Sequence, residues 1–473
     1  MRKAIFIFVW VLCGAWSFDA LAYELIVPKS KKAFQAIQRD AQNRQIESIS
    51  KDYQLLRFET KAERDAYFEE LKSQGVDAEL NVKFSADVIS TGDSQSLSIE
   101  ADLSQLDPGI QYQWSLYNPS IFESSRFYGG DIDWLRANKL SKGRGRLIVV
   151  DSGVAVGHPD LMGKVIAGYD AVYNNNQPID ENGHGTHVAS VAAGAENLIG
   201  IVGVAPGDGV EIVDVRMLGA DNSATTVQAI RAFNFIEDHI EAYFEQNSEG
   251  FIVINNSWGG PDFSASLEAA MSRLGQFDRV LVITSAGNDN RNNDQAGYWP
   301  CLSSIPNNIC VGASDANDYK TSFSSFGRSS VDLLAPGHQI IGAAASSSSY
   351  VDKSGTSQAV PHVAGAALLI WDANPTLKAA DIKQILLQSV DRLPGAENEV
   401  LSAGRLNAHR AILMATGADP SIADRAFDQV FERREGGGCH LALQSSSGWN
   451  FVGILLLSLV LLYAIRNRRL LRS

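Results

Sequence analysis

Between residues 112 and 417, short apolar runs alternate with amphipathic segments, and this alternation limits the possible folds more than any other feature of the chain. Near-continuous Val/Ile runs separated by helical patterns are typical of a parallel sheet covered by helices on both faces. The apolar runs are RLIVVD, VEIVDV, FIVINN, RVLVITSAG and NICVGAS. We therefore predict a three-layer α/β domain with a mostly parallel sheet between helices. Ligands of such sheets bind beyond the carboxyl ends of the strands.

Size and charge narrow the class of protein. The chain has 473 residues, of which 45% are hydrophobic, so it can bury a substantial core. Its formal net charge of −14 argues against nucleic-acid binding, because nucleic acids bind to basic surfaces.

Three segments precede the predicted domain. Residues 1–22 begin with Arg2 and Lys3, continue with the apolar run AIFIFVWVLCGAW and end on Ala-Leu-Ala, the pattern of a secretory signal that signal peptidase removes. Residues 23–84 show strand and helix patterns in turn and predict a small α+β unit that ends with a closing strand over residues 78–84. Residues 85–111 form the expected exposed linker. We therefore predict that the protein is exported.

Three further segments follow the domain. Residues 418–448 form a polar spacer that contains EGGGC, and residues 466–473 carry four arginines. Residues 449–465 are mostly apolar and just long enough to cross a bilayer as a transmembrane helix. The basic tail would then face the cytoplasm. The helix is expected either to stay as a single-pass membrane anchor or to be removed after export.

Three polar residues stand where chemistry is expected. Asp151 ends the run RLIVVD, His184 begins HGTHVAS, and Ser357 lies in SGTSQAVPHVAG. A serine hydroxyl is a poor nucleophile at neutral pH unless a base lies within hydrogen-bond reach, and that base needs a carboxylate to fix its tautomer. We therefore predict that Ser357 is a nucleophile, His184 its base and Asp151 the acid that orients His184.

The surroundings of Ser357 suit this role. Small residues on either side leave room for a carbonyl substrate, and the start of a helix favours the negative charge that develops there. Pro361 is expected in the first turn of that helix, where its missing N–H needs no partner. Asn288 follows VLVITSAG directly, and its amide could hold the oxyanion together with the backbone N–H of Ser357.

In VVDSGV, HGTHVAS, NNSWGG, SAGN and SGTSQAVPHVAG, the chain resembles the subtilisin-like serine proteases, whose motif blocks occur in this order. The likeness covers about residues 112–417 and implies a subtilisin-like fold, peptidase activity and the four roles given above. It also implies that two strips of the cleft pair with an extended peptide substrate by β-type hydrogen bonds. These strips are Ser257, Trp258 and Gly259, and Ser285, Ala286 and Gly287.

The resemblance extends to features outside the motif blocks. Asp160 and Asn197 match positions that hold a structural calcium ion (Ca2+) in related proteases, although both residues are also common in ordinary turns. Residues 23–84 resemble the propeptide of this family, an inhibitor and folding chaperone, with a cut expected between about Phe84 and Tyr112. The alternative is a binding domain that stays attached.

The C-terminal segments resemble a GlyGly-CTERM sorting signal. That likeness implies removal of the helix near Gly436 to Cys439 by a rhombosortase, and a Gram-negative cell envelope.

Cys301 and Cys310 are close enough in sequence to form a local disulfide in an oxidising compartment, and two buried free thiols are the alternative.

We therefore predict a secreted or cell-surface serine endopeptidase that cleaves proteins or peptides through an acyl-enzyme and is made as an autoprocessed zymogen. Two other functions fit part of the sequence: a sedolisin-like carboxyl peptidase, which would need Glu where HGTH stands, and a non-catalytic surface-binding protein on a protease scaffold. By resemblance, Gly297 before Tyr298 suggests an open pocket with a broad preference or a preference for large apolar side chains. Asp289 and Asp294 could instead attract basic residues.

Overall fold

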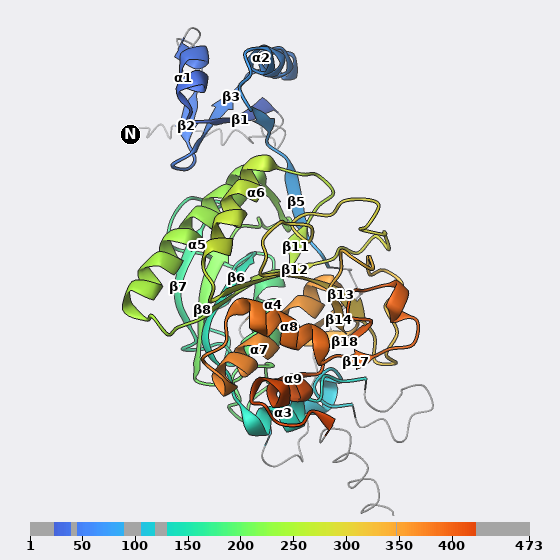
Figure 1. Ribbon diagram of the computed structural model, residues 1–473. Helices are drawn as coiled ribbons and strands as arrows, with labels where there is room; N and C mark the ends of the chain where they lie inside the picture. The colour runs from blue at the N-terminus through green and yellow to red at the C-terminus, as the bar shows by residue number, and fades with distance from the viewer. Residues whose placement is uncertain (1–22, 39–44, 89–105, 119–129, 347, 422–473) are drawn as a thin grey trace, which may run out of the picture. The chain divides into compact units, whose positions relative to one another are not determined.

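The computed structural model describes residues 23–38, 45–88, 106–118, 130–346 and 348–421 (Figure 1). The predicted signal peptide, transmembrane helix and basic tail lie outside these residues, as do most of the linker and of the polar spacer. Within the described ranges, no helix is both long and apolar enough to cross a membrane.

A nine-stranded sheet forms the centre of the main domain, in the order β17-β18-β14-β13-β12-β10-β6-β8-β7 (Figure 1). All neighbouring strands are parallel except β17 and β18, so the predicted parallel sheet is confirmed. In chain order the strands are β6 (Arg144–Asp151), β7 (Val165–Asp170), β8 (Gly209–Arg216), β10 (Ile252–Asn256), β12 (Val280–Ser285), β13 (Asn308–Ser314), β14 (Leu333–Pro336), β17 (Asp391–Arg392) and β18 (Gly404–Arg405).

Helices cover both faces of this sheet, which explains why the strands are apolar throughout. In β6, Leu147 and Val149 join one core with α4, α7, α8 and α9, whereas Ile148 and Val150 join a second core with α5 and α6. Every one of these strand residues is fully buried. The helices are α3 (Trp134–Leu140), α4 (His184–Ala193), α5 (Thr226–Gln246), α6 (Ala265–Ser272), α7 (Thr356–Ala373), α8 (Ala379–Gln388) and α9 (Ala408–Ala415).

Short elements complete the domain. They are the strands β9 (Ser223–Thr225), β11 (Trp258–Gly259), β15 (Ile340–Ala343) and β16 (Tyr350–Lys353), and the 3-10 turns η3 (Pro108–Tyr112), η4 (Arg273–Gln276) and η5 (Ala396–Asn398).

Residues 23–80 form a separate antiparallel sheet, in the order β2-β3-β1-β4, with two helices. Its elements are β1 (Glu24–Pro28), α1 (Lys31–Gln38), β2 (Ile46–Ser48), β3 (Tyr53–Arg57), α2 (Lys61–Ser73) and β4 (Glu79–Leu80). Helix α2 begins with a capping box between Thr60 and Glu63, and its buried face presents Tyr67 and Leu71 to the core of this N-terminal unit.

The closing strand expected over residues 78–84 is divided between two sheets. Only β4 belongs to the N-terminal sheet. The next strand, β5 (Lys83–Ala86), lies in a three-stranded sheet between β11 and β9 of the main domain. Both of its pairings are antiparallel, so β5 is hydrogen-bonded on both edges.

Candidate active site

Asp151 is the last residue of β6, at the carboxyl end of the central sheet. Its side chain is fully buried, and Oδ1 accepts a hydrogen bond from the backbone N–H of Ser152 at 2.7 Å. The same oxygen lies 2.7 Å from Nδ1 of His184. This contact fixes the imidazole tautomer with the proton on Nδ1, which leaves Nε2 free to act as a base.

His184 is the first residue of α4, and the loop after β6 holds it in place. The Ser152 hydroxyl accepts a hydrogen bond from the N–H of Gly185 at 2.9 Å. A Cβ atom at Gly185 would collide with the carbonyl oxygen of Gly153 and come within 3.0 Å of Asp151 Cβ, so only glycine allows this close approach. His184 Nε2 is buried and has no hydrogen-bond partner in the described structure.

The two other fully buried histidines of the main domain, His187 and His362, are held by backbone carbonyls. Burial lowers the pKa of His362 to about 4 and that of His187 well below its usual value. His362 Nδ1 lies 2.8 Å from the carbonyl of Gln358, and His187 Nε2 lies 2.9 Å from the carbonyl of Ile340. Both rings are therefore neutral and already hydrogen-bonded.

Ser357 is the second residue of α7 and is fully buried. Its hydroxyl donates to the carbonyl of Ser257 at 2.8 Å, and the Ser257 hydroxyl donates to the carbonyl of Ser357 at 2.9 Å. The structure therefore brings Asp151 and His184 into hydrogen-bond contact but does not form the expected bond between His184 and Ser357. A rotation about the Cα–Cβ bond of Ser357 is needed to turn its hydroxyl away from Ser257.

The expectation for Pro361 is wrong. Helix α7 begins at Thr356, so Pro361 is its sixth residue and lies in the second turn. A proline at this position leaves the carbonyl of Ser357 without its usual helical donor. The Ser257 hydroxyl supplies the missing hydrogen bond. The proline is therefore tolerated because the cleft itself satisfies the freed carbonyl.

The carbonyl oxygen of Asp87 lies at the predicted oxyanion site. The backbone N–H of Ser357 donates to the carbonyl oxygen of Asp87 at 3.1 Å. Asn288 Oδ1 accepts from the N–H of Thr356 at 2.9 Å, which orients the amide, and its Nδ2 is buried without a partner. Nδ2 and the Asp87 carbonyl both lie next to Gly355.

Only one of the two predicted strips pairs with the segment that ends at Asp87, because the other edge of β5 pairs with β9 rather than with the second strip. Trp258 and Gly259 form β11, which pairs with Ala86 and Ser85 of β5, and the carbonyl of Ser257 accepts from the N–H of Asp87 at 3.3 Å. Phe84 packs edge-on against the Trp258 ring, with 5.6 Å between the ring centroids. The second strip, Ser285, Ala286 and Gly287, continues from the end of β12 and is fully buried at Ser285 and Ala286.

Comparison with known proteins places the chain in a family. The sequence profile described as the Subtilase family matches residues 145–427. The chain belongs to the subtilase family. It is a subtilisin-like serine endopeptidase, and it is similar to named proteases. It is 36% identical over 300 residues to thermitase of Thermoactinomyces vulgaris, covering 63% of this chain and 99% of that protein.

Two further proteins are similar to this subtilase. Subtilisin DY of Bacillus licheniformis is 36% identical over 247 residues, which cover 52% of this chain and 83% of the relative. The crystal structure of a cold-adapted subtilisin-like serine proteinase is 32% identical, covers 57% of this chain and 90% of its own, and has a TM-score of 0.49.

Oxygen atoms suited to a hard cation gather around Asn197 of the subtilase. Asp160 Oδ1 and Asp107 Oδ2 are buried without a hydrogen-bond partner, and Asp107 Oδ1 accepts from the N–H of Asn197 at 3.1 Å. Two unpartnered carboxylate oxygens beside a carboxamide fit calcium. No group of three or more His, Cys, Asp or Glu side chains in the described ranges is placed to hold a metal ion.

Sequence reasoning missed two residues near these sites, Asp87 and Asp107, and misjudged Tyr298. Asp107 lies in the predicted linker, and Asp87 follows β5 without any motif around it. Tyr298 was read as part of an open pocket, yet it is buried. Only three-dimensional packing brings these side chains to their sites.

Cys301 and Cys310 are joined by a disulfide, with their Cα atoms 5.0 Å apart.

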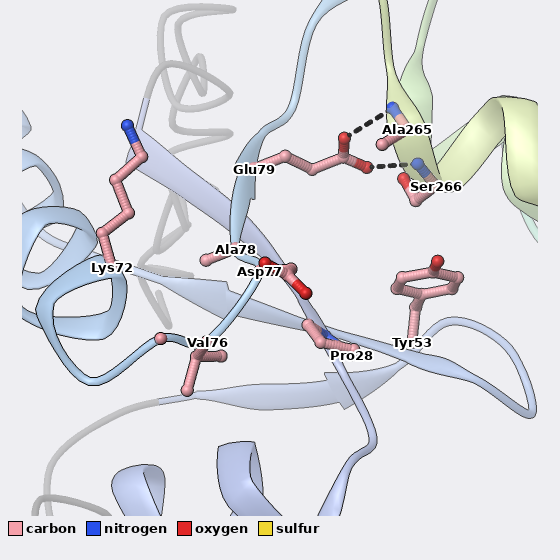
Figure 2. Close-up of a pocket in the computed structure, with 10 residues that line it drawn as sticks. Pro28, Tyr53, Lys72, Val76, Asp77, Ala78, Glu79, Ala265 and Ser266 are labelled. Carbon is pink, nitrogen blue, oxygen red and sulfur yellow. Dashed lines mark hydrogen bonds between the residues drawn. The ribbon is translucent and has the colours of Figure 1, made fainter.

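A cavity of about 340 Å³ lies between the N-terminal unit and the start of α6, lined in part by Tyr53, Val76 and Glu79 (Figure 2). Figure 2 shows the Glu79 carboxylate accepting hydrogen bonds from the backbone N–H groups of Ala265 and Ser266, at 2.9 and 3.1 Å. None of the predicted catalytic residues lines this cavity.

Proposed function

We propose that this subtilase is exported as a zymogen and hydrolyses peptide bonds through an acyl-enzyme. Ser357 Oγ attacks the substrate carbonyl, and His184 accepts its proton and passes it to the leaving amine. Asp151 orients His184 and stabilises its cationic form. The Ser357 N–H and the Asn288 amide hold the oxyanion.

One observation carries this proposal. A backbone carbonyl from the N-terminal part of the chain accepts a hydrogen bond from the Ser357 N–H, and the unpartnered Asn288 amide lies beside it. The site is therefore built around a bound peptide. The decisive experiment is labelling of the processed protein with a serine-directed fluorophosphonate. We expect one labelled peptide that contains Ser357, and absence of labelling in fully processed, folded protein would contradict the proposal.

We propose that residues 23–84 act as an inhibitory propeptide. Support comes from contacts that lie outside the cleft. Lys51 forms an ion pair with Glu237 at 3.2 Å, Glu47 forms one with Arg231, and Glu79 accepts from the first N–H groups of α6. A carboxylate at a helix N-terminus is favourable because the helix dipole is positive there.

We also propose that the C-terminal segments direct sorting at the cell envelope. This rests on the sequence alone, since residues 422–473 lie outside the described ranges. Removal of the helix by a rhombosortase would give a mature protein that ends before residue 449. Mass spectrometry of the secreted protein measures that end directly.

Asn288 provides a quantitative test of the oxyanion site. We expect Asn288→Ala to lower kcat by about 10²–10³-fold, because one of the two oxyanion donors is lost. KM should change little, since the ground-state carbonyl gains much less from this donor than the transition state does. Steady-state kinetics on a peptide substrate separate the two constants. An unchanged kcat would remove Asn288 from the mechanism.

Calcium is proposed as a structural ligand held by Asp107, Asp160 and Asn197. We compare protein in calcium far above its Kd with protein in a calcium chelator. We expect the Tm to be roughly 5–10 °C lower in the chelator, because calcium binding stabilises only the folded state. Calorimetry on a Ser357→Ala background avoids self-digestion. Asp160→Ala should abolish the difference, whereas the exposed control Asp278→Ala should keep it. A Tm that does not respond to calcium would exclude the site.

A further inference from the structure

The residue that occupies the cleft next to Ser357 is Asp87. Its N–H donates to the Ser257 carbonyl at 3.3 Å, and its own carbonyl accepts from the Ser357 N–H at 3.1 Å. Asp87 therefore stands in the place of the P1 residue, the residue on the N-terminal side of the bond to be cut. The bond that faces Ser357 is the one between Asp87 and Val88.

The side chain of Asp87 is held by two hydroxyl groups. The Ser285 hydroxyl donates to Oδ2 and the Tyr298 hydroxyl donates to Oδ1. Asp87 is 6% exposed, Tyr298 5% and Ser285 not at all. Within the described ranges, Lys, Arg and His side chains form no ion pair with Asp87, so two neutral donors satisfy one carboxyl group.

The ring of Tyr298 limits the size of this pocket. It is wedged between the two strips of the cleft: a Cβ atom at Gly259 would collide with the ring, and one at Gly287 would come within 2.9 Å of it. The backbone after Tyr298 is fixed as well, because Trp299 and Gly260 exchange two hydrogen bonds of 2.8 Å. A side chain longer than aspartate would have to displace the ring.

We propose that Ser285 and Tyr298 select aspartate as the P1 residue, and that the first cut of this chain falls between Asp87 and Val88. This inference rests on the proposed function. In that cut, Ser357 Oγ bonds to the Asp87 carbonyl carbon while the bond to the Val88 nitrogen breaks, and His184 gives that nitrogen its proton. Water then hydrolyses the ester and frees the new carboxyl of Asp87.

The pocket should also make this preference depend on pH. Burial raises the pKa of Asp87 to about 6, against the hydrogen bonds from Ser285 and Tyr298 and the charge of His184, which lower it. The charge of Asp289 acts on the same group and also raises its pKa. Because the pKa is higher in the bound state, aspartate binds best below its unbound pKa, and this gain is lost as the pH rises through about 6.

The test uses mature enzyme from the full chain and peptides that differ only in the P1 residue: Asp, Asn, Glu, Ala, Phe or Lys. We expect kcat/KM for Asp to exceed that for Ala by at least about tenfold, with Glu and Phe below Asp. The ratio for Asp over Ala should rise about tenfold between about pH 7.5 and about pH 5. A pH effect on the catalytic groups is common to both substrates and cancels in this ratio.

Tyr298→Phe is the matching variant, because it keeps the ring and removes the hydroxyl. It should lower the ratio of Asp to Ala about tenfold or more, since a buried carboxyl group loses one of two donors. Ser285→Ala should act in the same direction and covers the case that Tyr298→Phe does not fold. The control is Tyr169→Phe. Tyr169 lies on β7, and its hydroxyl donates to Asn174 at 2.7 Å, so its removal should leave the ratio of Asp to Ala unchanged.

Two failures are distinguishable. Efficient cleavage after Phe or Lys with no preference for Asp would overturn the acidic pocket and leave the peptidase intact. Absence of hydrolysis of every peptide, together with absence of fluorophosphonate labelling, would instead overturn the proposed function. Mass spectrometry of the released N-terminal fragment is the second readout. We expect it to end at Asp87, and a fragment that ends elsewhere from the first turnover onward would contradict the assignment.

Discussion

Replacing Ser357 with alanine should leave a full-length chain that neither processes itself nor cleaves added peptides. The expected loss in kcat is about 10⁶-fold, because the nucleophile and the base act as one unit and neither works alone. The bond between Asp87 and Val88 should stay intact, which mass spectrometry of the purified protein measures. The buried contacts of the Ser357 backbone do not depend on the hydroxyl, so we expect the variant to fold.

The control for this substitution is Ser272→Ala, at an exposed position at the end of α6. It should process and cleave like the unmodified protein. Complete processing of the Ser357→Ala chain, expressed without any active copy, would show that another protease makes the cut. Residual hydrolysis of added peptides near the normal rate would reject Ser357 as the nucleophile.

Asp151→Asn should lower kcat by about 10⁴-fold while the fold is retained. An asparagine Oδ1 can still accept from the N–H of Ser152, so the loop after β6 keeps its hydrogen bond. The neutral amide no longer stabilises a cationic His184, and it can hold the ring in the wrong tautomer. The comparison is with Asp278→Asn, whose carboxylate forms an exposed ion pair with Lys378 at 2.8 Å. A loss below about tenfold in Asp151→Asn would exclude the orienting role.

The sheet and the order of the motifs were predictable because both depend on local patterns. Strands such as β6 and β12 are apolar on both faces, and a polar residue directly after such a strand lies at the edge where parallel sheets bind ligands. Asp151 and Asn288 were found in this way. The family resemblance then assigned their roles, which the experiments above test.

The rest depends on contacts between distant parts of the chain. The apolar alternation of residues 78–84 predicts a strand but does not name its neighbours, so the division into β4 and β5 could not be foreseen. Gly297 suggested an open pocket. The Tyr298 ring fills that space because Gly259 and Gly287, which are distant in sequence or on another strip, leave room for it, and a local motif does not show this. Pro361 was expected in the first helical turn because a proline there leaves no carbonyl without a donor. It lies in the second turn, and the carbonyl of Ser357 that it leaves free accepts from a side chain 100 residues earlier, which the local sequence does not show.

The pairing of β5 on both edges has a consequence for timing. A cut between Asp87 and Val88 breaks none of the backbone hydrogen bonds that join β5 to β11 and β9. It also leaves the Glu79 carboxylate bound at the start of α6. With the proposed cut between Asp87 and Val88, we expect the severed segment to stay bound and to compete with substrates, so newly processed enzyme should be inactive for an interval. The length of this inactive interval is set by dissociation or digestion of the segment rather than by the rate of the cut. Added salt weakens exposed ion pairs, so it should shorten the interval.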